Sequence, residues 1–420
     1  MMPAARRLAT VTLLAVVVLG ATVVSCTAPS DETDLHLDEP WFGVLEPELD
    51  RAAELRAAGI QVVMLAVSWN SYEPEQGRGD PAYQRTVRER YADLRRAGHE
   101  VVLSPGLQCP PSWVFELDDH TRFVDQYGEP WHGDVGQDVP NAVFNPKVRR
   151  AQEDYLHRIA DDLADLEFFG VRASGLPDDE LRYPEARAGG PPDSFWAFDH
   201  HAQAASPVPG WKPGQPGVDE ANAFLEFYLD SLAGYGEWSV ATHRAAFGAS
   251  PTLMVQLGSW GVRPGDIDAA AATRLDGSSP GVSRETLQQG LDWERQLPRF
   301  AQADGVIVSG TWMDAPDQGT EVGDESPIRY IARLAEPLGL GVIGENTGRN
   351  DADEMLRSVR RVVDLDLEGM MWMRGPDLFT DEGYASIDDY AAAIAGVREA
   401  SVNGEERFDR TSGQSAAESS

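Results

Sequence analysis

Short apolar runs alternate with longer segments of helical spacing along most of this 420-residue sequence, and this alternation most constrains its fold. The runs are Phe42–Leu45, Val62–Val67, Glu100–Leu103, Phe168–Arg172, Thr252–Leu257, Gly305–Val308, Gly341–Ile343 and Gly369–Trp372. Continuous apolar runs are typical of parallel strands that are buried on both faces of a sheet. Eight strand–helix units are the number that closes a barrel, so the pattern predicts an α/β fold of the (β/α)8 TIM barrel class.

The segments between these runs carry apolar residues at helical spacing. The predicted helices are Leu49–Ala58, Tyr83–Ala97, Val148–Leu166, Asn222–Phe247, Glu285–Phe300, Ile328–Leu338, Ala352–Val363 and Ile387–Val397. Long loops after the third and fourth strands, Pro105–Asn145 and Gly175–Ala221, would lie on the C-terminal face of the barrel, where active sites sit. A doubly wound open sheet is the alternative fold, but no G-x-G-x-x-G follows the first strand and no phosphate-loop motif appears, so nucleotide binding has little support.

The N-terminus has the pattern of an export signal. Arg6 and Arg7 precede the apolar run Leu8–Val24, and the sequence V-V-S-C that ends at Cys26 resembles a bacterial lipoprotein signal. We therefore predict a signal peptide over residues 1–26 and a lipid on Cys26. This lipid would hold the protein at the extracellular face of the cell membrane, and secretion is the other possible outcome. An uncleaved anchor helix is the alternative, although the apolar run is at the short limit for a membrane span.

The remaining residues divide into three parts. We predict an acidic tether over residues 27–38, the barrel over residues 39–400 and a disordered tail rich in Ser, Glu and Gly over residues 401–420. The formal net charge of -34 repels nucleic acid, so nucleic acid is not an expected partner. The chain has two cysteines, and with lipid on Cys26 we expect no intrachain disulfide and a structural role for Cys109.

Two glutamates follow predicted strands at the same end of the barrel. Glu180 lies in the segment D-D-E-L-R-Y-P after the fourth strand, and Glu345 follows the seventh strand. Cleavage of a glycosidic bond requires one carboxyl group to donate a proton and another to activate water or to attack carbon. We therefore predict that both are catalytic, with a surface glutamate as the ordinary alternative. The Asp178 and Asp179 carboxylates would raise the pKa of Glu180, and Arg182 would lower it.

Tryptophans recur at the ends of the predicted strands. Because sugar rings stack their C–H faces on indole, we predict that these residues bind a saccharide, with packing in the core as the alternative for each. They are Trp69, Trp113, Trp260, Trp312 and Trp372. No metal site is expected, because the sequence contains no H-E-x-x-H or C-x-x-C motif. A Ser–His–Asp hydrolase is disfavoured because no G-x-S-x-G nucleophile elbow, with a strand before the serine and a helix after it, is present. No cofactor is expected.

The E-L-R-Y-P motif that begins at Glu180 and the G-E-N motif around Glu345, in this order, resemble the acid-bearing and base-bearing segments of β-amylases, glycoside hydrolase family 14. The resemblance implies a (β/α)8 barrel. It also implies that Glu180 is the general acid and Glu345 the general base of an inverting hydrolysis. Supporting site residues implied by the resemblance are Thr311, Asn346 and Arg374. Tyr183 is a further predicted substrate contact.

The sequence departs from the β-amylase pattern around the sugar. Leu107 replaces a histidine, Pro110–Trp113 replaces a glycine-rich loop, and Asp179 replaces the glycine before the acid. We therefore expect an exported hydrolase that acts on an oligo- or polysaccharide with altered substrate preference. The segments Y-E-P and P-S-W also resemble the retaining β-galactosidases of family 42, but no Asn precedes Glu180 as in that family. The alternatives are such a β-galactosidase, a non-catalytic sugar-binding lipoprotein on a degenerate barrel, and an esterase or deacetylase.

Overall fold

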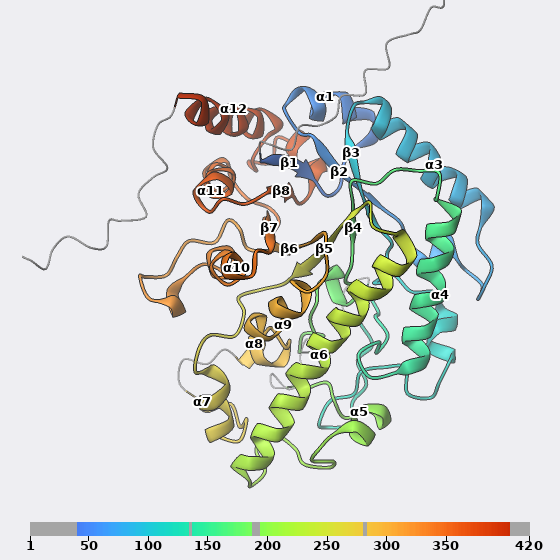
Figure 1. Cartoon of the computed structure of the whole chain (residues 1–420), viewed down its shortest axis with the longest axis vertical. Helices are drawn as coiled ribbons and strands as arrows, with labels where there is room; N and C mark the ends of the chain where they lie inside the picture. Colours follow the sequence, from blue (N-terminus) through green and yellow to red (C-terminus); the bar gives the residue numbers. More distant parts are fainter. Residues whose placement is uncertain (1–39, 134–136, 187–193, 280–283, 404–420) are drawn as a thin grey trace, which may run out of the picture. The chain divides into compact units, whose positions relative to one another are not determined.

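The structure, a computed structural model, describes residues 40–133, 137–186, 194–279 and 284–403. Eight parallel strands close into a barrel in sequence order, and β8 pairs with β1 (Figure 1). The strands are β1 (Trp41–Val44), β2 (Val62–Ala66), β3 (Glu100–Ser104), β4 (Gly170–Arg172), β5 (Thr252–Leu257), β6 (Val306–Gly310), β7 (Gly341–Glu345) and β8 (Gly369–Trp372). This confirms the predicted (β/α)8 TIM barrel. The predicted signal peptide, Cys26 and the tether lie outside the described residues.

The helices lie around the ring of strands (Figure 1). They are α1 (Ala52–Ala57), α2 (Trp69–Tyr72), α3 (Pro81–Arg96), α4 (Pro146–Asp162), α5 (His200–Ala205), α6 (Val218–Phe247), α7 (Asp266–Ala272), α8 (Arg284–Gln288), α9 (Trp293–Phe300), α10 (Pro327–Ala335), α11 (Ala352–Asp364) and α12 (Ile387–Asn403). Among the described residues, no helix combines the length and the apolarity that a membrane span requires.

Two predicted boundaries are corrected by local structure. The segment predicted as one helix over Glu285–Phe300 is divided into α8 and α9, because Gly290 has a φ of 73° and Asp292 caps the second helix. Helix α12 runs to Asn403, so the first three residues of the expected tail are helical; the rest of that tail lies outside the described residues.

Side-chain caps and prolines determine where α3 and α4 begin. The Asp80 carboxylate accepts hydrogen bonds from the first backbone N–H groups of α3, and the Asn145 side-chain oxygen does the same for α4. Each cap is followed by a proline at the first helical position, where a missing N–H costs nothing. The long connection after β3 therefore ends at Asn145.

Alternate residues of each strand face the barrel interior or the surrounding helices. The interior cluster is apolar: Trp41, Leu45, Val62, Val102, Met254, Ile307, Ile343 and Met371. Gly369 makes room for it, because an added Cβ would lie 2.5 Å from the Trp41 ring. The strands' other faces join the large core that packs against the helices. Since the interior is filled by these side chains, the carboxyl ends of the strands are left for polar groups.

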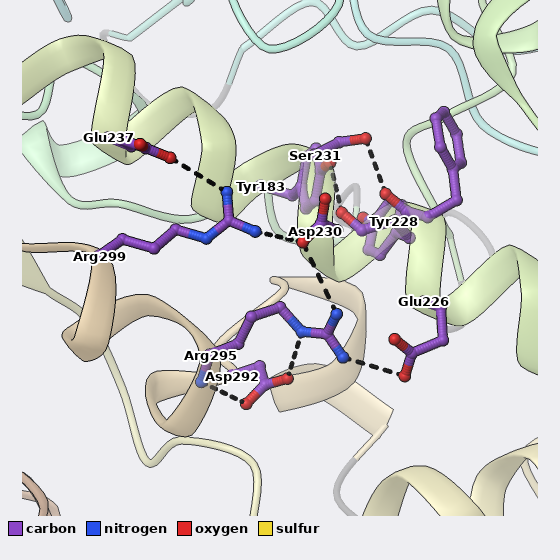
Figure 2. Close-up of polar contacts among 10 residues, drawn as sticks. Tyr183, Glu226, Tyr228, Asp230, Ser231, Glu237, Asp292, Arg295 and Arg299 are labelled. Atoms are coloured by element: carbon purple, nitrogen blue, oxygen red, sulfur yellow. Dashed lines mark hydrogen bonds and ion pairs between the residues drawn. The ribbon is translucent and has the colours of Figure 1, made fainter.

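Helix α6 is fastened to α9 by ion pairs on the protein surface (Figure 2). Arg295 lies 2.9 Å from Glu226, Arg299 lies 3.3 Å from Glu237, and both arginines also contact Asp230. The acidic partners are largely exposed, so each pair contributes at most about 1 kcal/mol to stability. The ion pairs help to fix the position of α6. This matters for the site because α6 carries Tyr228, on which Tyr183 of the loop after Glu180 packs.

Candidate active site

Glu345 is the last residue of β7 and is only 3% exposed. Ile343, two residues earlier, belongs to the interior cluster, so the Glu345 side chain lies on the same inward face. Its Oε2 atom accepts a hydrogen bond from Nη1 of Arg172 at 3.3 Å. Arg172 ends β4 and is likewise buried. A buried cation from β4 therefore faces the carboxylate at the end of β7.

Glu180 follows the short 3-10 helix η3 (Pro177–Asp179) in the loop after β4. Its Oε2 atom accepts a hydrogen bond from Nε of Arg182 at 2.6 Å, and its side chain is 14% exposed. The carboxyl group lies against Gly258, the residue after β5, where an added Cβ would be 2.6 Å from the Glu180 Cδ atom. Glu180 therefore sits at the ends of β4 and β5, nearly but not wholly removed from solvent.

Backbone hydrogen bonds hold the segment that carries Glu180. The N–H of Leu181 donates to the Gln256 carbonyl at 2.8 Å, and the N–H of Tyr183 donates to the Gln289 carbonyl at 2.9 Å. The segment is thus anchored on both β5 and the turn after α8. These anchors fix the position of the Glu180 carboxyl group. A fixed position is what a catalytic group requires, and a glutamate on a free surface loop would lack it.

The two carboxyl groups have perturbed acidities. Burial raises the pKa of Glu180 to about 7, with contributions in the same direction from the Asp178 and Glu345 carboxylates and an opposing one from Arg182. Burial also raises the pKa of Glu345, but the Arg172 guanidinium opposes that rise. Burial, which the sequence could not reveal, outweighs the neighbouring charges at Glu180. A carboxyl group with such a pKa is suited to act as a general acid near neutral pH.

Arg172 and Asp179 complete the polar centre of the site. Neither was predicted from the sequence as a site residue. Nε of Arg172 forms an ion pair with Oδ2 of Asp179 at 2.9 Å. The Ser104 hydroxyl donates to the same oxygen at 3.2 Å, and the Gly175 N–H donates to Oδ1 at 3.0 Å. The available signal was an arginine at the inward position of an apolar strand, because a buried charge requires a partner.

Trp260 and Trp312 form an aromatic pair in the loops after β5 and β6. Trp312 is 39% exposed, Trp260 is half-buried, and their ring centroids are 5.9 Å apart at an interplanar angle of 56°. The loops that carry them are tied together, since the N–H of Ser259 donates to Oγ1 of Thr311 at 3.1 Å. Thr311 is buried, and through this hydrogen bond it joins the two loops. Arg374 is exposed after β8, and its substrate-binding role stays a prediction.

Three other predicted sugar contacts are corrected, because their rings are buried. Trp69 stacks on Tyr155 with centroids 4.9 Å apart, and Trp372 packs on Tyr390 at 5.9 Å. Tyr183 stacks on Tyr228 of α6 at 4.1 Å and donates its hydroxyl hydrogen to the Tyr228 carbonyl at 2.9 Å (Figure 2). These rings stabilise the core around the site and offer no face to a saccharide. Trp113 is half-buried and retains a partly accessible ring.

Asn346 is also corrected from a sugar ligand to a fixed part of the loop after β7. Its amide nitrogen donates to the Gly348 carbonyl and to Oδ1 of Asn350, each at 2.8 Å. Its oxygen accepts from the N–H of Met373 at 2.6 Å. Both amide hydrogens are used within the protein, and the residue is fully buried. Asn346 therefore joins the loops after β7 and β8 next to Glu345.

The described residues contain no group of three or more His, Cys, Asp or Glu side chains arranged to hold a metal ion. The polar centre is instead made of paired carboxyl and guanidinium groups. No protein-family model matches the sequence. A search of curated proteins also finds no match.

The barrel is similar to the catalytic domain of a β-amylase. The match, to the domain from Paenibacillus polymyxa, has a TM-score of 0.67 and 16% identity and covers 85% of this chain and 98% of that domain. A β-galactosidase from the psychrophilic Marinomonas ef1 matches with a TM-score of 0.59 and 13% identity over 87% of this chain and 60% of that one. The fold resemblance to β-amylases is thereby confirmed.

The weaker resemblance to family 42 is confirmed in the same way. A family 42 β-galactosidase from G. stearothermophilus matches with a TM-score of 0.57 and 11% identity over 86% of this chain. This chain spans 57% of the length of that protein. At these identities the likeness shows a shared fold.

Proposed function

We propose that this protein is a glycoside hydrolase in which Glu180 is the general acid and Glu345 the general base. One observation carries the proposal: Glu345 at the end of β7 is buried, Glu180 after β4 is only 14% exposed, and burial, with a contribution from the Glu345 carboxylate, raises the pKa of Glu180 to about 7. Paired carboxyl groups with separate acid and base roles are the usual machinery of glycosidic bond hydrolysis. The likeness of the barrel to glycoside hydrolases supports the proposal.

The proposed reaction balances through one water molecule. Protonated Glu180 donates its proton to the glycosidic oxygen as the bond from that oxygen to the anomeric carbon breaks. Glu345 accepts a proton from water, whose oxygen forms the new bond to that carbon. Exchange with solvent then returns a proton to Glu180 and removes the one on Glu345. Attack by water on the face opposite the leaving group inverts the anomeric configuration.

We expect an oligo- or polysaccharide substrate. The Trp260 and Trp312 rings are available to stack on sugar rings, and Trp113 and Arg374 remain candidates for further contacts. Asn346 and Tyr183, which the sequence predicts as substrate contacts, are instead buried. The departures from the β-amylase pattern at Leu107, Pro110–Trp113 and Asp179 favour a substrate preference unlike that of β-amylases. The proposed reaction needs no cofactor.

The test is hydrolysis by purified protein of a panel of α-glucans and β-galactosides, with E180Q and E345Q as matched variants. The proposal expects one class to be cleaved and both variants to lose nearly all activity while remaining folded. Proton NMR of the first product formed distinguishes inversion from the retention expected of a family 42-like β-galactosidase. Cleavage that survives either substitution would remove that glutamate from the mechanism.

A non-catalytic sugar-binding protein is the second candidate function. The specific observation in its favour is that three predicted aromatic contacts and Asn346 are buried, which leaves few side chains to form substrate subsites. Saccharide binding measured by calorimetry, together with the absence of turnover across the panel, would favour this candidate over the hydrolase.

We further propose that the protein is exported and anchored by lipid at Cys26. The support is the sequence pattern alone: a basic start, an apolar run and a cysteine at its end. Metabolic labelling with a fatty acid and cell fractionation test this, with C26A as the comparison. Loss of label and release from the membrane fraction are expected for C26A.

A further inference from the structure

Asp179 occupies an unusual position for a residue with a side chain. Its φ is 59° and that of the preceding Asp178 is 57°, so two consecutive residues adopt the left-handed conformation. This conformation is unfavourable for most L-residues, although Asp and Asn tolerate it better than others. Something in the folded structure must therefore hold the aspartate there.

The contacts of Asp179 show what holds it. Its carboxylate accepts hydrogen bonds from the Gly175 N–H and the Ser104 hydroxyl, and it forms an ion pair with Arg172. The three partners come from β3, β4 and the loop after β4. The aspartate is therefore fully used inside the protein and does not face a substrate.

Arg172 contacts two carboxylates at once. Its Nε atom lies 2.9 Å from Asp179 and its Nη1 atom 3.3 Å from Glu345. The guanidinium fork thus binds one acid at the end of β7 and the other in the loop after β4. A planar fork that contacts two acids can orient both, which a lysine could not do in the same way.

We propose that Arg172 and Asp179 are positioning residues that hold Glu345 in place and set its charge state. This inference rests on the proposed function of Glu345 as the base. Arg172 stabilises the Glu345 carboxylate. Asp179 orients Arg172 and shares its positive charge, so that Glu345 stays able to accept a proton. The charged or titratable groups that face Glu345 are Arg172, Asp179 and Glu180, and the Gln256 side chain also contacts it.

The proposal predicts opposite effects for the two partners. Removal of the guanidinium in R172M raises the pKa of Glu345, and the acidic limb of the kcat/KM profile moves up by about 1–3 pH units. Removal of one charge in D179N leaves Arg172 to act on Glu345 alone, so the same limb moves to lower pH. R172K restores the charge without the fork, and we expect it to recover the pH profile only in part.

R361M is the matched control. Arg361 is 7% exposed, as is Arg172, but it donates to the Met313 and Ala315 carbonyls instead of to a carboxylate of the site. Both R172M and R361M therefore lose a buried arginine. Only R172M should move the acidic limb of the kcat/KM profile. Shifts in the same direction for R172M and D179N, or no shift in either, overturn the proposal.

A measurement without turnover separates this inference from the proposed function. Carbon-13 NMR of protein labelled at the glutamate carboxyl carbon follows the titration of Glu345, whose signal is identified by its loss in E345Q. Opposite shifts of this titration in R172M and D179N support the charge arrangement even if no saccharide is cleaved. Cleavage without such shifts leaves the hydrolase intact and removes Arg172 and Asp179 from it.

Discussion

The carboxyl group of Glu180 occupies the space where a side chain at residue 258 would begin. A Cβ added to Gly258 would lie 2.6 Å from the Glu180 Cδ atom, which is closer than two carbon atoms can approach. The glycine after β5 is therefore a condition for the position of the proposed acid in the loop after β4.

We predict that G258A lowers kcat/KM by roughly 10- to 100-fold, because displacement of a catalytic group by about 1 Å has effects of this size. Activity assays and thermal unfolding of the variant check this. G396A in α12 is the matched control, since nothing lies within 4 Å of a Cβ added there. Full activity of G258A would show that Glu180 does not act from this position.

The raised pKa of Glu180 makes the stability of the protein depend on pH. Its value of about 7 in the folded state exceeds the value of about 4.3 for an unfolded chain, so the native state binds more protons between these values. The contribution of Glu180 to stability is complete below about pH 4 and is lost as the pH rises through 7. Relative to E180Q, the wild type should lose up to about 3 kcal/mol between pH 4.5 and pH 8.

Urea unfolding of both proteins at the two pH values measures this difference. Because the comparison is between pH values, any effect of the E180Q substitution that does not depend on pH cancels. A difference in the free energy of unfolding that is constant with pH would show that Glu180 has an ordinary acidity.

The same pKa predicts the alkaline limb of the activity profile. Glu180 must carry a proton to act as an acid, so kcat/KM should fall about tenfold per pH unit well above pH 7. Initial rates across the pH range, with stability confirmed at each value, test this. An alkaline limb far above pH 7 would assign the acid role to another group.

Trp312 is predicted to bind substrate without supporting the fold. Because its ring is 39% exposed, W312A should weaken saccharide binding by roughly 1–2 kcal/mol while the unfolding temperature stays nearly unchanged. Calorimetric titration of E180Q and of E180Q/W312A measures the binding. V322A, which alters an exposed apolar residue in the same connection after β6, is the control and should bind normally.

Trp69 is predicted to behave in the opposite way. Its ring is buried and stacked on Tyr155, so W69A should lower the free energy of unfolding by about 3–5 kcal/mol. Denaturant unfolding measures the loss. A stable W69A protein with weakened saccharide binding would instead restore Trp69 to the substrate site.

The predicted strands agree with the structure to within about two residues because their signal is local. An apolar run such as Thr252–Leu257 indicates a strand whatever its neighbours are, and its bounds are unchanged in the structure. The predicted helix over Glu285–Phe300 was less successful, since one left-handed residue, Gly290, interrupts a continuous helical pattern.

The tryptophans show what local sequence patterns cannot predict. Trp69 and Trp312 both occur near a strand end, yet one is buried and the other is 39% exposed. Sequence spacing places a residue along a strand or loop, but it does not say which segments cover it. The burial of Trp69 depends on Tyr155 of α4, which is distant in the chain.

Local periodicity along the chain was enough to predict the barrel, the order of its strands and the placement of Glu180 and Glu345 at two strand ends. The raised pKa of Glu180 and the contacts of Arg172 with both Asp179 and Glu345 could not be predicted in this way, because they depend on segments that are distant in the chain. Closure of the barrel brings the ends of β4, β5 and β7 together and removes the carboxyl groups of Glu180 and Glu345 from water. Charges that are separated along the chain then act on one another at short range.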